Sequence, residues 1–253
     1  MIKKHLFTCS VILVSVVILK LFTYSTTERK SPVKNARYFA YLTAGMEERR
    51  GYNFAEESIP VANKKVNRRI RISLWRHSVN KEGSVLLHRK ALQLFPIIEP
   101  ILLAYGIPDD FKYMPLVESG LKEGTSPRGA AGLWQFMPST ARDYGLKVGN
   151  GRDDRLSVRK STIAACKYLR ELYTQFNSWT LAAAAYNAGS PRIQHAINRN
   201  NHGNYYLMSL NSETASYVYK LIAMKDLIKK PHNYGVKGVY TTYLPPAELL
   251  AIN

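Results

Sequence analysis

The chain has 253 residues, of which 46% are hydrophobic and 21% charged, so it is long enough for one sizeable domain with attachments. This balance of apolar and charged residues argues against a chain that is disordered throughout. Lysine and arginine total 36 against 18 acidic residues, and the resulting net charge of +18 indicates an anionic partner.

Residues 1–24 are predicted to form a membrane anchor or a signal segment. Lys3 and Lys4 precede an apolar run at 6–24, whose 19 residues are interrupted only by Lys20. A run of this length is within the roughly 17–25 residues that span a bilayer, although its uninterrupted part also suits a cleaved signal peptide. No Ala-x-Ala cleavage site follows, which favours an uncleaved anchor. In both cases the folded part is exported, and the basic N-terminus stays in the cytoplasm.

A polar tether is predicted for residues 25–57, where few apolar residues recur at helical spacing. The next segment, residues 62–77, is rich in lysine and arginine but keeps apolar residues four positions apart. This spacing predicts a helix with one core-facing stripe and a solvated basic face. The residues of the stripe are Val66, Ile70 and Leu74.

A second helix is predicted at about 85–105, and together the two helices form an N-terminal helical extension at 58–105. Pro96 and Pro100 lie inside the second helix. Because proline lacks the backbone N–H of the helical ladder, we expect a kink or a break at these positions.

A short helix then carries the acid Glu118. Pro108 suits its first turn and Gly120 its end. At about 100° per residue, Glu118 falls between Phe111 and Met114, on the apolar face of the helix. A desolvated carboxyl resists ionisation, so Glu118 is a candidate general acid. The helix alone is equally typical of a half-exposed glutamate near a helix end.

The loop at 126–135 is rich in glycine and alanine, which allow backbone groups to approach a ligand closely. Trp134 offers a flat apolar face on which a sugar ring could lie, and Gln135 supplies both a donor and an acceptor. An acid, small-residue walls, an aromatic platform and an amide together predict a carbohydrate cleft.

The sequence after Pro138 predicts further helices and no real sheet, beyond a short hairpin at the Gly-Ala loop. The alanines at 182–185 allow close packing against a neighbouring helix. The expected fold class is therefore mainly α. Candidate first residues or caps of these helices are Ser139 or Thr140, Ser157, Ser178, Pro191 and Ser212.

Four motifs resemble the lytic transglycosylase domain of the goose-lysozyme-like superfamily, in its membrane-bound D type but without repeat modules. They are Glu118-Ser119, the run from Gly132 to Pro138, the run from Ala185 to Gly189, and Glu213-Thr214 with Tyr217-Val218. The likeness extends over about 58–230. It implies a lysozyme-like helical lobe, with the catalytic domain at 106–230 and a C-terminal tail at 231–253.

The resemblance implies that Glu118 is the general acid and base and that the Tyr186 hydroxyl lies beside it. It also implies contacts to the substrate from Ser119, Ser126, Trp134, Gln135, Met137, Asn187, Glu213 and Tyr217. Of these, Tyr217 matches a family tyrosine that lies near the acid.

Purely structural roles remain open for several of these residues. Tyr186 and Asn187 suit the C-terminal end of a helix, and Trp134 and Met137 suit a core. Glu213 suits the first turn of a helix, where an acid stabilises the helix dipole.

A second catalytic acid is not evident, although most glycosidases use a carboxylate pair. Glu123 lies in the loop after the acid, and we expect Asp153 and Asp154 to remain solvated in a charged loop. The resemblance instead implies single-acid chemistry. Glu118 protonates the bond between N-acetylmuramic acid and N-acetylglucosamine, and the muramyl C6 hydroxyl then closes a 1,6-anhydro ring.

No metal or cofactor is expected, because Cys9 and Cys166 cannot plausibly meet and the implied chemistry needs none. The expected partners are peptidoglycan glycan strands and, through residues 1–24, a membrane, at the periplasmic side of the cell envelope. The sequence does not identify protein partners. Three rival functions are a hydrolytic muramidase, a non-catalytic wall-binding protein and a nucleic-acid binder. The export segment and the lack of a recognition motif argue against nucleic acid.

Overall fold

The computed structural model describes residues 52–78, 81–119 and 124–234. The chain divides into two units, Met1–Arg49 and Arg50–Asn253, and every described residue belongs to the second unit. The predicted anchor, most of the predicted tether and most of the predicted tail therefore lie outside the described residues. Across the three described ranges, no helix combines the length and the apolar character needed to cross a membrane.

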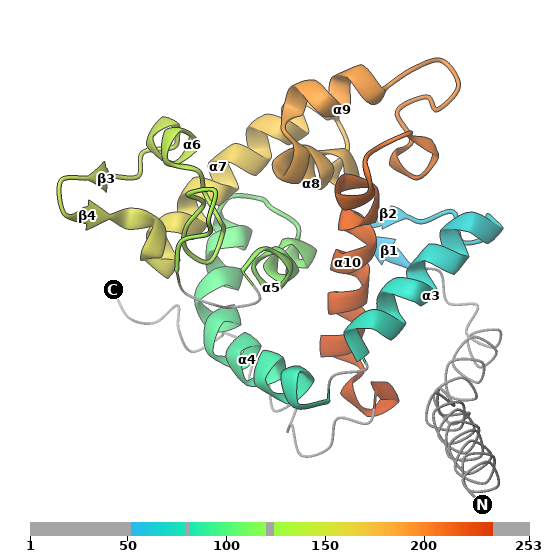
Figure 1. Cartoon of the computed structure of the whole chain (residues 1–253), viewed down its shortest axis with the longest axis horizontal. Helices are drawn as coiled ribbons and strands as arrows, with labels where there is room; N and C mark the ends of the chain where they lie inside the picture. Colours follow the sequence, from blue (N-terminus) through green and yellow to red (C-terminus); the bar gives the residue numbers. More distant parts are fainter. Residues whose placement is uncertain (1–51, 79–80, 120–123, 235–253) are drawn as a thin grey trace, which may run out of the picture. The chain divides into compact units, whose positions relative to one another are not determined.

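The described part is mainly helical, as the sequence predicts (Figure 1). Its α-helices are α3 (Lys64–Ser78), α4 (Lys81–Ala104), α5 (Met114–Glu118), α6 (Pro138–Asp143), α7 (Val158–Phe176), α8 (Trp179–Ala188), α9 (Ser190–Ala196) and α10 (Ser212–Lys229). The 3-10 helices are η1 (Asp109–Tyr113), η2 (Asp154–Leu156), η3 (Tyr205–Leu207) and η4 (Pro231–Tyr234). The antiparallel strand pairs are β1 (Asn53–Phe54) with β2 (Glu57–Ser58), and β3 (Val148–Gly149) with β4 (Arg152–Asp153).

Helix α10 organises the core by packing along α3 and contacting α5 and α8 (Figure 1). The stripe of α3 at Val66, Ile70 and Leu74 is buried, as its spacing predicts. In α8, the alanines at 182–185 have no exposed surface, which confirms the close packing expected of small side chains. Through these contacts, α3 from the early part of the described chain and α10 from its late part pack together, and α10 also contacts the helix that carries Glu118.

The hairpin β1–β2 corrects the predicted boundary of the tether at residue 57. Phe54 has no exposed surface, and its ring centroid lies 5.3 Å from that of Phe111. The backbone N–H of Ala55 donates to Oδ2 of Asp110 at 2.7 Å, and Lys225 contacts the same oxygen at 2.6 Å. The folded unit therefore begins before the predicted extension.

Glu57, in strand β2, caps the N-terminus of α8. Its carboxylate accepts hydrogen bonds from the backbone N–H groups of Trp179 at 2.5 Å and Thr180 at 3.0 Å, and from the Ser178 hydroxyl at 2.9 Å. These N–H groups lack partners within the helix, so the carboxylate satisfies them and stabilises the positive helix end.

Helix α4 continues through Pro96 and Pro100 without a break and starts at Lys81, earlier than predicted. The two prolines are four residues apart, so the hydrogen bonds they remove lie on one side of the helix. The apolar residues Phe95, Ile98 and Leu102 are buried, and their packing holds the remaining ladder in place.

The prediction of at most one hairpin, at the Gly-Ala loop, is wrong in position and number. That loop has only isolated bridges, Thr125↔Ala131 and Ala131↔Phe136. Instead, Asn150 and Gly151 join β3 to β4 with positive φ angles of 52° and 75°. An Asn-Gly pair is a strong signal for a two-residue hairpin turn, although the flanking strands here are too short to show an alternating pattern.

The predicted helix starts are confirmed in part. Ser157 and Ser178 cap α7 and α8 through their side chains. Neither Ser139 nor Thr140 caps α6, which begins at Pro138. Helix α10 does begin at Ser212, but its cap is the side chain of Asn211.

Candidate active site

Glu118 ends a short helical segment whose first part is a 3-10 helix. The helix η1 passes directly into α5, where the sequence suggested a single short helix. Met114 and Leu116 are buried on this segment, whereas Glu118 remains partly exposed. A carboxyl that is largely enclosed but still accessible is suited to proton exchange with a bound molecule.

Burial raises the pKa of Glu118 to about 7, because the surrounding protein disfavours the charged carboxylate. The hydrogen bond from Tyr217 and the positive charge of Lys220 oppose this increase, and the negative charge of Glu213 adds to it. Both protonation states of Glu118 are therefore populated near neutral pH. This property suits a group that first donates a proton and then accepts one.

Tyr217, on α10, donates a hydrogen bond from its hydroxyl to Oε1 of Glu118. The Tyr217 side chain is almost completely buried. Burial raises the pKa of Tyr217, and the neighbouring charge of Glu118 raises it further, so the hydroxyl stays protonated as a donor. The acid is thus fixed in position by a helix distant in sequence.

The resemblance implies that the Tyr186 hydroxyl lies beside Glu118, and this hydroxyl makes a hydrogen bond of its own. Its hydroxyl donates to the backbone oxygen of Trp134 at 2.9 Å. Burial raises the pKa of Tyr186, with a further contribution from the charge of Glu118, so the two side chains are electrostatically coupled. The hydroxyl that bonds to the acid belongs to Tyr217, and Tyr186 instead fixes the loop after the acid.

The Gly-Ala loop is held by Arg155, a buried residue whose role has no local sequence signal. Its guanidinium donates to the backbone oxygens of Gly129 at 2.7 Å and Phe136 at 2.9 Å, and it pairs with Asp153 at 2.7 Å. Gly132 lies directly against this residue. A Cβ at Gly132 would lie 1.9 Å from the backbone oxygen of Arg155, so the loop has room only for glycine there.

Trp134 does not provide the predicted platform for a sugar ring. Its side chain has 0% exposure, and its indole Nε1 donates to Oγ1 of Thr162 at 2.9 Å. The ring lies near that of Tyr186, with centroids 6.4 Å apart. Trp134 is therefore a core residue that anchors the loop, which was the structural alternative for it.

Ser119, Ser126 and Gln135 each use a polar atom in a local hydrogen bond. The Ser119 hydroxyl donates to the backbone oxygen of Pro115 at 3.0 Å. The Ser126 hydroxyl accepts from the backbone N–H of Ala130 at 3.1 Å, and Nε2 of Gln135 donates to the backbone oxygen of Gly132 at 2.8 Å. All three residues remain partly exposed.

Asn187, Met137 and Glu213 lie in three different settings. Oδ1 of Asn187 is buried and has no hydrogen-bond partner in the described part of the chain. Met137 is 43% exposed, so the core alternative for it does not hold. Glu213 is exposed in the first turn of α10, where an acid stabilises the helix dipole, and its charge still reaches Glu118.

The two aspartates considered as a second acid are bound in ion pairs. Asp153 contacts Arg155, and Asp154 contacts Arg152 at 3.0 Å and Lys160 at 2.8 Å. The Lys160 hydrogen bond is the largest of several contacts that lower the pKa of Asp154. Asp154 is buried, so the expectation that it stays solvated is wrong. Glu123, the remaining candidate in that loop, lies outside the described residues.

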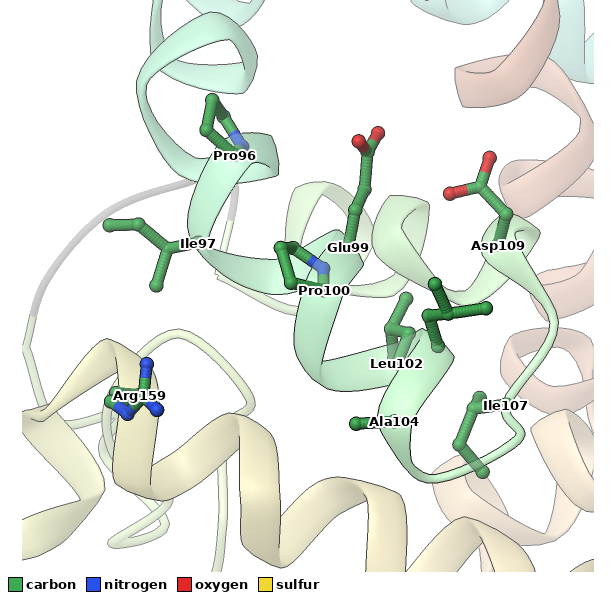
Figure 2. A pocket seen from close by; sticks show the side chains of 10 residues that line it. Pro96, Ile97, Glu99, Pro100, Leu102, Ala104, Ile107, Asp109 and Arg159 are labelled. Atoms are coloured by element: carbon green, nitrogen blue, oxygen red, sulfur yellow. The ribbon is translucent and has the colours of Figure 1, made fainter. Parts of the chain in front are cut away.

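A cavity of about 600 Å³ along α4 shares no residue with this site (Figure 2). Its lining is mainly apolar and includes Pro96, Ile97 and Pro100 from α4, with Arg159 entering from α7. The two acids in the lining, Glu99 and Asp109, both pair with Lys112 at 2.6 Å. Within the described ranges, no cluster of three or more His, Cys, Asp or Glu side chains is placed to hold a metal ion.

Residues 104–209 match the Transglycosylase SLT domain family. Over 138 residues the chain is 38% identical to membrane-bound lytic murein transglycosylase D of Escherichia coli (strain K12), which covers 52% of this chain and 30% of that protein. It is 33% identical over 133 residues to a putative tributyltin chloride resistance protein of Alteromonas sp. (strain M-1), with 51% and 64% covered. The 70 kDa soluble lytic transglycosylase SLT70 of Escherichia coli aligns with a TM-score of 0.44 and 24% identity, over 53% of this chain and 23% of that one.

Residues 104–209 are therefore similar to transglycosylase SLT domains, in agreement with the resemblance of the motifs. It spans 30% of the length of the first relative, so the match concerns the domain and not that whole protein. The matched residues include Glu118, Tyr186 and Asn187 but end before Tyr217. The partner of the acid thus comes from a helix beyond the matched range.

Proposed function

We propose that this chain is a peptidoglycan lytic transglycosylase that cleaves the β-1,4 bond between N-acetylmuramic acid and N-acetylglucosamine. The observation that carries the proposal is the pair formed by Glu118 and Tyr217. Burial raises the pKa of Glu118 to about 7, and a neutral tyrosine holds this acid in place. An SLT domain with such an acid has the group that this cleavage requires. The names of the Escherichia coli relatives support the same substrate class.

Glu118 acts first as the general acid. Because Tyr217 donates to Oε1, the transferable proton resides on Oε2. This proton passes to the glycosidic oxygen as the bond to C1 of the muramyl ring breaks, and the N-acetylglucosamine end leaves with a free hydroxyl. Positive charge develops at C1, as in other glycosidic cleavages, and the neighbouring acetamido group helps to stabilise it.

Glu118, now a carboxylate, then acts as the base. It removes the proton from the C6 hydroxyl of the muramyl ring, and the resulting oxygen attacks C1. A 1,6-anhydro ring closes, Glu118 regains its proton, and the reaction consumes neither water nor a cofactor. A single acid with a pKa near the working pH is suited to both steps.

The ion pairs of the other acids favour internal attack over hydrolysis. A hydrolase needs a second carboxylate to activate water, and Asp153 and Asp154 are already paired with cations. Glu213 is the described acid whose charge reaches Glu118, so it is the base to consider if the chain is a muramidase. A non-catalytic wall-binding protein would have no use for an acid held in this way.

The proposal includes action at the periplasmic side of the cell envelope, with residues 1–24 as a membrane anchor. The apolar run in that segment and the description of the first relative as membrane-bound support this part. The net charge of +18 suits glycan strands whose muramyl and peptide groups are anionic.

The ends of the released sugars test the reaction directly. Purified sacculi are digested, one half of the digest is reduced with borohydride, and both halves are examined by mass spectrometry. We expect muropeptides that are lighter by one water than hydrolytic products and that do not react with borohydride. Reducible muramyl ends in nearly all products would identify a muramidase, and undigested sacculi would identify a wall-binding protein.

A further inference from the structure

A cavity of about 330 Å³ lies between α3 and α10, close to the proposed acid. Ser216 and Lys220 of α10 line it, and they lie one residue before and three residues after Tyr217. Residues three apart are neighbours on a helix surface, so Lys220 lies beside the residue that bonds to Glu118. The positive charge of Lys220 also acts to lower the pKa of Glu118, in agreement with this placement.

The lining of this cavity is basic. Arg69, Arg76 and Lys220 contribute to it, and no acidic side chain does. Within the described ranges, neither Arg76 nor Lys220 forms a salt bridge with a carboxylate. Burial lowers the pKa of His77, which also lines the cavity, and the charges of Lys220 and Arg76 lower it further. The cavity therefore has a positive potential without an internal counter-charge.

Ser73 adds an unpaired polar group to the same cavity. Its side chain is 8% exposed, and its hydroxyl is buried with no hydrogen-bond partner in the described part of the chain. Most buried polar groups in proteins have a partner, so this hydroxyl is a donor without an acceptor next to the basic lining. The first turn of α10, at Ser212, also lines the cavity and contributes the positive end of the helix dipole.

We infer that this cavity binds a carboxylate of the peptide stem carried by the glycan strand. The inference rests on the proposed function, because it takes peptidoglycan as the substrate. The stem is attached to the muramyl ring, which is the ring that Glu118 acts on, so a stem must extend close to the acid. Arginine binds planar carboxylates through paired hydrogen bonds, and a serine hydroxyl can donate a further one.

This binding gives the enzyme a preference for glycan that still carries peptide stems. It assigns that preference to α3 and α10, which lie outside the residues matched by the SLT family. Recognition of the stem and cleavage of the sugar bond are then separable, because Arg76 has no contact with Glu118 among the described interactions.

The test compares Arg76→Gln with Arg68→Gln on two substrates. Arg68 is exposed on the same helix and does not line the cavity, so both variants lose the same charge. The substrates are intact peptidoglycan and the same glycan after an amidase has removed the stems. We expect Arg76→Gln to raise the half-saturating concentration of intact peptidoglycan about three- to tenfold, with kcat unchanged. Arg68→Gln should have the same kcat and the same half-saturating concentration as the wild type on both substrates.

Equal effects of Arg76→Gln on both substrates, or equal effects of the two variants, would overturn the inference in favour of general electrostatic attraction. A binding measurement separates this failure from a failure of the proposed function. The Glu118→Gln variant is titrated with a disaccharide-peptide that has free carboxylates and with its fully amidated form. The inference is supported if the Glu118→Gln variant binds the peptide with free carboxylates more tightly than the amidated form, and if adding Arg76→Gln removes this preference. This result would hold even if the wild type cleaved neither substrate. Equal binding of the two forms contradicts it.

Discussion

The hydroxyl of Tyr217 donates a hydrogen bond to Oε1 of Glu118, although the two residues are 99 positions apart in the chain. The contact connects the end of α5 to the second turn of α10 and lies within a network that includes Lys220 and Glu213. It therefore couples the ionisation of the acid to the position of a helix outside the SLT match.

Glu118→Gln removes the transferable proton but keeps the size of the side chain and its hydrogen-bonding atoms. We expect lytic activity on sacculi to fall by about 10²- to 10⁴-fold, in line with the loss of a general acid. Glu171→Gln, which changes an exposed glutamate on α7, is the matched control and should remain fully active. Substantial activity in Glu118→Gln would remove Glu118 from its proposed role.

The same variant should change stability in a pH-dependent way. The pKa of Glu118 is raised from its ordinary 4.5 to about 7, so the folded state disfavours ionisation and loses stability as pH rises through this window. Glutamine does not titrate, so the stability of Glu118→Gln relative to the wild type should increase from pH 4 to pH 8. We expect this increase to be roughly 1–3 kcal/mol. Urea unfolding at the two pH values measures this. A pH-independent difference would mean that the carboxyl is not perturbed by folding.

Tyr217→Phe removes the hydrogen bond that lowers the pKa of Glu118, so the pKa should rise. Since the acid must start protonated, we expect the alkaline limb of the activity profile to move up by about half a unit to one unit. The maximal rate should fall about ten- to a hundredfold, as for the loss of one polar contact in a catalytic site.

Tyr186→Phe is the comparison, because its hydroxyl bonds to the backbone of Trp134 and not to the acid. This variant should lower the rate while the alkaline limb stays in place. If the limb moved in Tyr186→Phe and not in Tyr217→Phe, the two roles would have to be exchanged.

Gly132→Ala should distort the loop after the acid. Its φ of +75° is unfavourable for an L-residue, and the added Cβ would lie 1.9 Å from the backbone oxygen of Arg155. We expect a loss of about 2–4 kcal/mol of stability together with most of the activity. Gly129→Ala is the control, since its φ is +87° but a Cβ there meets nothing within 4 Å. It should lose only about 1 kcal/mol. Thermal unfolding and a lytic assay on both variants decide the point.

The helices were predictable from sequence because each depends on a local signal. The four-residue spacing of Val66, Ile70 and Leu74 indicated α3, and the side-chain caps at Ser157 and Ser178 marked the starts of α7 and α8. The burial of Phe111 and Met114 in the segment before Glu118 was predictable as well, because both belong to its apolar face. These features involve neighbours in the chain, and their physics is contained in short segments.

The errors concern contacts between distant segments. No local pattern indicates that Glu57 caps α8 from 122 residues away, or that Arg155 supports the loop at Gly129. The burial of the Trp134 ring was not predictable for the same reason, because it depends on the packing of the loop against α7. The hydrogen bond from Tyr217 to Glu118 likewise depends on how α10 docks against α5.

The position of Tyr217 has a consequence for the synthesis of the protein. A ribosome makes Glu118 and every residue of the SLT match before it makes α10, so a nascent or truncated chain ending before residue 212 contains the acid without its partner. Such a chain also lacks Lys225, which helps to hold the N-terminal hairpin through Asp110. We therefore expect wall-cutting activity to appear only when the final helix docks, which leaves an incomplete chain harmless to the cell that is making it.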